Sequence, residues 1–466
     1  MTDSVMADRR HFAFTIMFHY LFPVLTMGLG VLIAVLKTLE LRTKDPHYGS
    51  AARFWARIFA VTFAAGVVTG IPMEFQFGTN WARFSHFAGP VVGQTLFMEG
   101  VFAFFAESSF LGLFLFGERR LGPVLHWLSA VMVAAGAVLS GFFIVATNAW
   151  MQHPVGYRIV EGRAELTSLW ALLTNPYARW QYPHVISGSL VVASMVMAGI
   201  GAYYLLARKH EAEGRLFVRV GVIAGLIFSV VSLFPTGSFH AENVARFQPA
   251  KMAAMEGVFE TQSRAGMAII GMPDSEKKRL MDPIVVPGVL SYLIYGDTRE
   301  EVIGLNDIPE DQHPPVEIVY YAYHIMVGLG TIFIAIFAIS GFQLWRGRLF
   351  ASRGVLWALM LAMPFPYIAN HAGWVVAEVG RQPWIVYGLR RTTEATSQNV
   401  TAGMTIFTLL GFMGLYALVG LLYLLLVLRI VHAGPGDAGH AHEPSGAPGN
   451  GDGPGDTHAA IGKARS

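Results

Sequence analysis

Nine long apolar runs constrain the fold of this chain more than any other feature of its sequence. A helix that crosses a bilayer needs about 20 consecutive, mostly apolar residues. The runs cover approximately residues 12–36, 56–77, 93–117, 124–150, 183–207, 217–236, 318–345, 353–378 and 402–431. Only 14% of the residues are charged, against about 25% in a typical soluble domain. The sequence therefore predicts an all-α, polytopic membrane bundle of nine transmembrane helices.

Basic residues between the runs predict the orientation of the chain. Lys and Arg concentrate in cytoplasmic connections. The first, third, fifth and seventh connections are short and basic, with Lys37, Arg42, Lys44, Arg53, Arg57, Arg119, Arg120, Arg208, Lys209, Arg215, Arg219, Arg346, Arg348 and Arg353. The second connection carries only Arg83. We therefore expect the N-terminus outside and the C-terminus in the cytoplasm.

The runs also divide the chain. Residues 1–237 hold transmembrane helices 1–6, and residues 317–432 hold helices 7–9. Residues 238–316 form a connection of mixed charge, which we expect to be an extracytoplasmic, partly ordered functional loop. Residues 433–466 are rich in Gly and Pro, and this composition predicts a disordered cytoplasmic tail. The first run lacks a small-residue cleavage site, so we interpret it as a retained helix.

The chain contains no cysteine. This excludes disulfides, thiolate-held iron–sulfur clusters, cysteine nucleophiles and c-type haem attachment. The net charge of +2 gives no electrostatic footprint for nucleic acid. A redox centre in this chain would have to be held by His, Met or carboxylate side chains.

Ionisable side chains within the apolar runs, together with one methionine that can ligate a metal, gather toward one side of the predicted membrane. Such residues are costly in a bilayer and usually functional. The candidates are His19, Glu99, Glu107, His184, His324, Met326, His371 and Glu378. With the predicted topology, nearly all of them fall in the outer half of the bilayer, which indicates one shared polar site or a row of cofactors. His and Met can ligate haem iron, and a carboxylate suits a site open to oxygen.

Structural interpretations of the same residues stay open. A lone membrane histidine can serve as a hydrogen-bonding group, Met326 can be packing, and Glu378 can pair with Arg381. His371 would be a neighbour of a cofactor rather than a ligand. Structural roles are assigned to His86, His126, His153 and His240, which lie at helix ends or in loops. Two other classes of protein remain: a secondary transporter, and a haem-b electron-transfer subunit without oxygen chemistry.

Four motifs carry a family resemblance. They are "EFQFGTNW" (74–81), "NAWMQHPVG" (148–156), "QPAKMAAMEGVFET" (248–261) and "GWVVAEVGRQPW" (373–384). In this order the chain resembles subunit I of cytochrome bd-type quinol oxidases, in the subfamily with a short quinol loop that includes cyanide-insensitive enzymes. The resemblance implies a terminal oxidase of the respiratory chain in the bacterial cytoplasmic (inner) membrane. Such an enzyme oxidises membrane quinol, reduces O2 to water and generates a proton gradient by vectorial proton uptake.

The resemblance also implies cofactors and partners. The cofactors are a low-spin haem b, a high-spin haem b, and either haem d or a third b-type haem. The partner is a second membrane subunit (subunit II) that forms a heterodimer, with a small accessory subunit in some members. His184 and Met326 resemble the axial ligands of the low-spin haem b, and His19 and Glu378 resemble axial ligands at the high-spin pair.

Further site residues follow from the same motifs. Trp374, Arg381 and Arg9 resemble residues that pack on the haems or neutralise them. Lys251 and Glu256 resemble the quinol-binding pair. Glu107, Glu99 and Ser140 resemble a proton path to the oxygen site, with Glu99 close to the iron. His324 stands where the family commonly has Arg, and it would bind a haem propionate or hydrogen-bond quinol.

Overall fold

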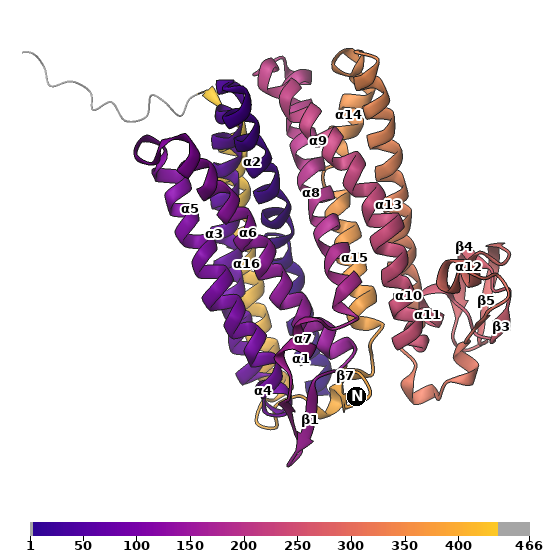
Figure 1. Ribbon diagram of the computed structural model, residues 1–466. Helices are drawn as coiled ribbons and strands as arrows, with labels where there is room; N and C mark the ends of the chain where they lie inside the picture. The colour runs from indigo at the N-terminus through magenta and orange to yellow at the C-terminus, as the bar shows by residue number, and fades with distance from the viewer. Residues whose placement is uncertain (1–2, 437–466) are drawn as a thin grey trace, which may run out of the picture.

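The computed structural model describes residues 3–436 (Figure 1). In this part of the chain, nine helical spans have the length and composition needed to cross a membrane. They are built from α1 (Asp3–Tyr20), α2 (Pro23–Thr43), α3 (Pro46–Thr79), α4 (Ala82–Met98), α5 (Phe105–Phe116), α6 (Glu118–Gln152), α8 (Ala178–Ala207), α9 (Glu211–Val231), α10 (Ser238–Phe247), α13 (Val316–Trp345), α14 (Arg353–Leu361), α15 (Phe365–Val379) and α16 (Ala402–Ala433). The predicted nine-helix membrane bundle is confirmed. Most of the predicted tail, residues 437–466, lies outside the described residues.

Several spans are interrupted by local irregularities that the apolar pattern did not reveal. The first span breaks after Tyr20, and α2 restarts at Pro23, which lacks a backbone N–H and suits a first helical turn. A π-helical turn, Glu99–Phe104, joins α4 to α5. A second π-helical turn, Ser232–Gly237, joins α9 to α10, so the sixth span continues to Phe247 instead of ending near residue 236. π-Bulges of this kind often occur at functional sites.

The long connection after the sixth span is folded. It contains α11 (Pro249–Glu256), β3 (Gln262–Ser263), β4 (Met267–Asp274), β5 (Arg279–Val286), α12 (Val289–Tyr295) and β6 (Glu301–Val302). β4 and β5 form an antiparallel hairpin, while α11 contributes Met252 and Met255 to an apolar cluster shared with α13 and α15. The smaller elements are β1 (Tyr157–Val160), β2 (Arg163–Leu166), α7 (Leu169–Leu173), β7 (Trp384–Val386) and β8 (Arg390–Arg391). The hairpin stands beside the helices and outside the bundle (Figure 1).

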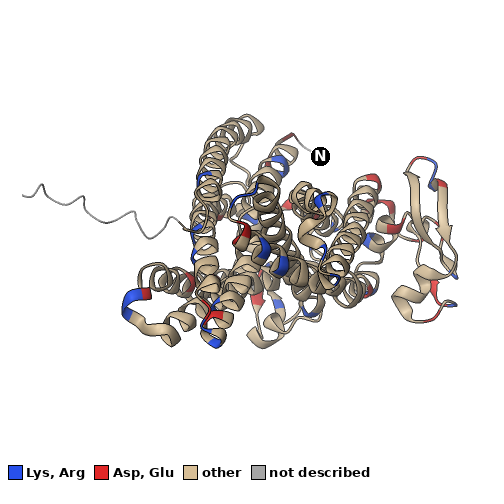
Figure 2. Ribbon diagram, turned by 90° about the horizontal axis from the view of Figure 1, so that it is seen from above, with Lys and Arg blue, Asp and Glu red and all other residues tan. Residues whose placement is uncertain are grey.

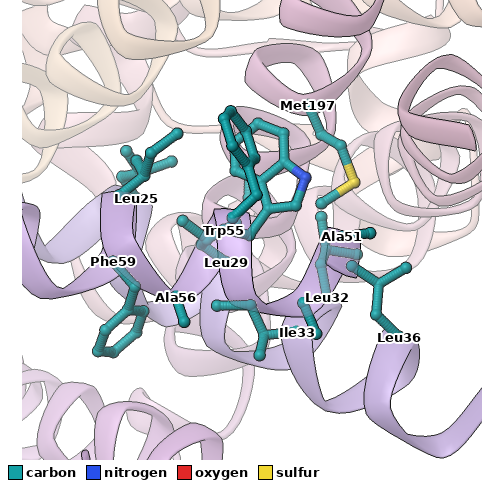
Figure 3. Close-up of a cluster of buried hydrophobic side chains, with 14 of the residues drawn as sticks. Leu25, Leu29, Leu32, Ile33, Leu36, Ala51, Trp55, Ala56, Phe59 and Met197 are labelled. Atoms are coloured by element: carbon teal, nitrogen blue, oxygen red, sulfur yellow. The ribbon is translucent and has the colours of Figure 1, made fainter. Parts of the chain in front are cut away.

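The largest apolar core holds α2, α3 and α8 together (Figure 3). Leu29, Leu32 and Leu36 recur at helical spacing on one face of α2 and are buried. They pack with Trp55 of α3 and Met197 of α8. Since lipid tails are as apolar as these side chains, close packing stabilises such contacts more than the hydrophobic effect does.

Gly28 tests how close that packing is. A Cβ built at Gly28 of α2 would lie 2.2 Å from the Ser189 carbonyl oxygen of α8, so Gly28→Ala is expected to force the helices apart and destabilise the fold by about 1–3 kcal/mol. Gly112→Ala on α5 is the matched control, because a Cβ there would meet nothing within 4 Å. Thermal denaturation at one scan rate should give a lower midpoint for Gly28→Ala alone. Equal midpoints would show that the contact is not tight.

Candidate functional site

Helix α15 lies at the centre of the candidate site. It contacts the C-terminal end of α1. Nε2 of His371 is 2.7 Å from the Met17 carbonyl oxygen, and Nδ1 is 2.8 Å from the Tyr367 carbonyl oxygen. One turn on, Trp374 packs edge-to-face against Tyr20, with ring centroids 5.7 Å apart. Both ring nitrogens of His371 are therefore engaged by backbone, an arrangement suited to a neighbour of a cofactor rather than a ligand.

The same helix contacts α13 and α8 through glycines. A Cβ at Gly373 would lie 2.8 Å from the Met326 sulfur of α13. On α8, a Cβ at Gly188 would lie 2.8 Å from the Asn370 side-chain oxygen of α15. Gly188 is one turn after His184. Small residues thus let α15 approach both helices that carry the predicted ligands of the low-spin haem.

His184 is oriented by the π-helical turn that follows α9. Its Nδ1 is 3.1 Å from the Ser232 carbonyl oxygen. A histidine that ligates a metal almost always donates its other ring N–H to a carbonyl or carboxylate. With Nδ1 as that donor, Nε2 is the nitrogen available to a ligand. The π-helical turn matters because it places this carbonyl beside the ring.

His19 occupies the last turn of α1, just before the break in the first span. Its Nδ1 is 3.0 Å from the Thr69 hydroxyl of α3. A Cβ at Gly70 would lie 3.0 Å from the ring carbon Cε1, so the absence of a side chain there makes room for the imidazole. Arg9, half-buried on the same helix, is ten residues earlier, about 15 Å along the axis.

The Glu378 carboxylate is held by three donors. Asn148 Nδ2 donates to Oε1 at 2.6 Å, Gln152 Nε2 donates to the same oxygen at 3.3 Å, and Arg381 Nη2 donates to Oε2 at 2.5 Å. The Arg381 side chain is 3% exposed, whereas that of Glu378 is 35% exposed. The carboxylate is thus oriented by the buried Gln152 and Arg381 and the half-buried Asn148, and is itself still accessible.

Buried amides connect Glu378 to the long loop. Gln152 Oε1 accepts from Lys251 Nζ at 2.7 Å and from Gln248 Nε2 at 2.9 Å. Gln181 Nε2 donates to Asn148 Oδ1 at 2.8 Å. Sequence reasoning missed the amide residues as site residues, although three of them lie in the motifs quoted above. The available signal was the four-residue spacing of Asn148 and Gln152, which places both on one helix face.

Lys251 and Glu256 of the long loop are both buried, and burial shifts the pKa of each side chain. Desolvation, followed by the nearby Arg381 charge, lowers the pKa of Lys251 well below its usual range. Desolvation raises the pKa of Glu256 to about 7, opposed by a hydrogen bond with Tyr323. Glu256 Oε2 has no hydrogen-bond partner among the described residues. Glu256 can therefore exchange a proton near neutral pH.

The predicted proton-path residues meet along one side of α6. Ser140 Oγ donates to Glu99 Oε1 at 2.9 Å. One turn earlier, a Cβ at Gly136 would lie 2.9 Å from Cα of Glu107, so α5 packs tightly on α6 at this buried acid. Glu99, the first residue of the π-helical turn, and Glu107, in the first turn of α5, therefore face consecutive turns of the same neighbour helix.

His324 contacts the long loop. Its Nδ1 is 2.9 Å from the Tyr320 carbonyl oxygen, and its Nε2 is 2.9 Å from the Ala268 carbonyl oxygen of β4. The ring stacks on Tyr320 with centroids 3.9 Å apart. In this structure the imidazole therefore fastens β4 to α13.

The fold and the site together define a polytopic membrane protein. Its helix α15 carries Glu378 and packs against Met326 of α13 and against α1 and α8, the helices that carry His19 and His184. The family model described as cytochrome bd terminal oxidase subunit I matches residues 7–435. The chain belongs to this family.

Individual relatives agree with the family match. The chain is 38% identical to cytochrome bd ubiquinol oxidase subunit 1 of Bacillus subtilis (strain 168), covering 95% of this chain and 97% of that protein. It is 31% identical to cytochrome bd-II ubiquinol oxidase subunit 1 of Escherichia coli (strain K12), covering 93% and 98%. The solved bd oxidase from Geobacillus thermodenitrificans superposes with a TM-score of 0.88 at 31% identity, covering 93% of this chain and 99% of that one. These matches favour the oxidase over the transporter and the simple electron-transfer subunit.

Proposed function

We propose that this chain is the haem-carrying subunit of a terminal quinol oxidase, which oxidises membrane quinol and reduces O2 to water. The observation that carries the proposal is the hydrogen-bonded series Glu378–Gln152–Lys251, which joins a predicted iron ligand to a predicted quinol-binding residue. Names of the relatives support the same activity. The expected cofactors are a low-spin haem b, a high-spin haem b, and haem d or a third b-type haem.

Side-chain chemistry at the site fits haem. Nε and Nη1 of Arg381 are buried and have no hydrogen-bond partner among the described residues, and a haem propionate supplies the charged acceptors they need. His184, Met326, His19 and Glu378 provide nitrogen, thioether and carboxylate ligands for iron. When bound, the haems supply electron transfer and the reduction of oxygen.

The ligand residues have separate tasks in this proposal. His184 of α8 and Met326 of α13 would hold the low-spin haem b. His19 and Glu378 hold the high-spin pair, where Arg381 and the Asn148 amide fix the orientation of the carboxylate. Trp374, which packs on Tyr20 at the end of α1, would pack on a haem, and Arg9, nearer the start of α1, would neutralise propionate charge.

Quinol binds at the long loop in this proposal. Lys251 donates a hydrogen bond to the headgroup, and the ionised Glu256 accepts a proton from a quinol hydroxyl. Because Lys251 also donates to Gln152, which donates to Glu378, the headgroup would be held close to the Glu378 carboxylate. Protons from quinol leave on the loop side.

Protons for water arrive from the opposite side. Glu107 takes up the proton first and passes it toward Glu99, whose carboxylate is oriented by Ser140. Uptake on one side and release on the other builds a proton gradient. This requires the predicted orientation, with the N-terminus and the loop outside and the C-terminus in the cytoplasm.

The remaining features of the proposal concern assembly. The chain sits in the bacterial cytoplasmic (inner) membrane, and the connection between the sixth span, which ends at Phe247, and α13 forms the quinol-binding loop. Its partner is a second membrane subunit that completes a heterodimer, with a small accessory subunit as a further component. His324 contributes by holding the loop against α13.

The direct test is oxygen consumption by the purified complex with a reduced quinol. Quinol-dependent uptake of oxygen, together with a haem spectrum, is the expected result. A haem spectrum without oxygen uptake would leave an electron-transfer subunit, and a colourless protein would contradict the proposal altogether.

Glu256→Gln is expected to lower kcat/KM for quinol by about 10²-fold or more, the usual contribution of a general base. A pKa raised to about 7 means that Glu256 keeps its proton below that pH. The rate of quinol oxidation by the unmodified enzyme should therefore rise as pH increases through about 7. In Glu256→Gln the rate should no longer rise over this pH range. Glu260→Gln, an exposed acid in the same loop, is the control. An unchanged pH profile in Glu256→Gln would remove Glu256 from the reaction.

A further inference from the structure

The hairpin of β4 and β5 exposes several large apolar side chains. Ile270 and Ile284 lie opposite each other across the two strands, and they are 61% and 60% exposed. Ile269, Met272 and Val285 are also exposed. Successive residues of a strand point to opposite faces, so Ile270 and Ile284 lie on one face, and exposed apolar surface of this kind marks an interaction site.

Two contacts fasten this hairpin to the first turns of a membrane span. The Ala268 carbonyl oxygen of β4 is 2.9 Å from Nε2 of His324. At the turn of the hairpin, the Ser275 amide donates to Glu317 Oε1 at 3.1 Å. The hairpin therefore crosses the first two turns of α13, with its charged turn at the end of the helix and its apolar base beside His324.

The length of α13 fixes the depth of this crossing. With 30 residues, α13 is about 45 Å long, whereas the hydrocarbon core of a bilayer is about 30 Å thick. About 7 Å at each end then lies among headgroups. His324 is eight residues after Val316, about 12 Å along the axis. The base of the hairpin thus reaches the boundary between headgroups and acyl chains.

The surroundings of the hairpin continue the same pattern. Exposed isoleucines recur every seven residues along α13, at Ile318, Ile325, Ile332 and Ile339, and form one apolar line on that helix. Five charged residues of the hairpin lie at its turn, visible at one end of the hairpin in Figure 2: Asp274, Glu276, Lys277, Lys278 and Arg279. A sixth, the exposed Asp282, lies further along β5. Exposed Tyr292 and Tyr295 follow in α12, and tyrosine is enriched at membrane interfaces.

We propose that the apolar face of the β4–β5 hairpin contacts membrane phospholipid, at the headgroup–acyl boundary of the leaflet on the loop side. The hairpin extends sideways from the bundle (Figure 2), so its outer face meets lipid rather than the spans of its own chain. Apolar side chains on the base and charges on the turn match the two layers that the hairpin would touch. The proposal concerns lipid contact and is independent of quinol chemistry.

Spin labels can test this, because the chain has no cysteine of its own. Ile270→Cys and Ile284→Cys would each be labelled with a nitroxide in the assembled complex, in phospholipid nanodiscs, and the signal of the unsubstituted complex subtracted. Collision with apolar O2, relative to a water-soluble nickel complex, should be severalfold higher at both positions than for Glu276→Cys, the matched control at the turn.

Two results would overturn the proposal. If the ratio of O2 to nickel-complex collision rates at positions 270 and 284 equals that at position 276, the apolar face of the hairpin lies in water. Low collision rates with both reagents would place it under protein, such as a partner subunit or a second copy. If Ile270→Cys fails to assemble with haem, Ile284→Cys carries the same expectation.

Discussion

Met326→Leu is expected to abolish the low-spin haem b signal, because leucine has a similar volume but no thioether to ligate iron. Changes to groups that merely orient metal ligands cost about 10–100-fold in affinity or activity, so loss of the ligand itself should lower quinol oxidation by at least ~100-fold. The measurements are a reduced-minus-oxidised spectrum and oxygen uptake with reduced quinol.

A matched control separates ligand loss from damage to packing. Met195→Leu replaces a fully buried methionine in the apolar core of α8, and it should leave the spectrum intact. Met326→His, which restores a ligating group, should recover a low-spin spectrum of altered position. A normal low-spin spectrum in Met326→Leu would withdraw Met326 from the ligand set and return it to packing against Gly373.

Glu107→Gln is expected to slow oxygen consumption by about 10²–10³-fold, within the range that positioned proton transfer contributes, while haem content stays unchanged. Glu107 is buried where α5 approaches Gly136 of α6. Glutamine keeps its shape but has no carboxyl group that can take up and release a proton. Steady-state oxygen uptake, haem content and the rate of haem reduction by quinol should be measured on the same preparation.

The pattern of these three measurements identifies the role of Glu107. A proton path predicts slow oxygen uptake with rapid haem reduction and full haem content. Glu118→Gln, a partly exposed acid at the start of α6 paired with Arg53, should behave like the unmodified enzyme. Loss of haem from Glu107→Gln would show a structural role, and normal turnover would exclude Glu107 from the path.

Some site features were predictable from sequence because they are local. Glu378 and Arg381 are one helical turn apart, so their ion pair follows from spacing alone, and it is present. The amide residues were harder, because Gln152 and Glu378 are 226 positions apart and only packing of α6 against the end of α15 joins them. The continuation of the sixth span past Pro235 was also missed, since proline normally ends a helix and here a π-helical turn accommodates it.

The sequence by itself determined that this chain is a bundle of nine membrane helices and that, lacking cysteine, it can hold metal only through His, Met and carboxylates. Both follow from composition, because transfer of an apolar helix into a bilayer depends on its own residues. Tertiary structure alone decided that α15 is the meeting point of the site, that Gln152 joins Lys251 to Glu378, and that the loop hairpin crosses α13. These depend on where glycines let helices approach and where π-helical turns redirect them, which no single segment specifies.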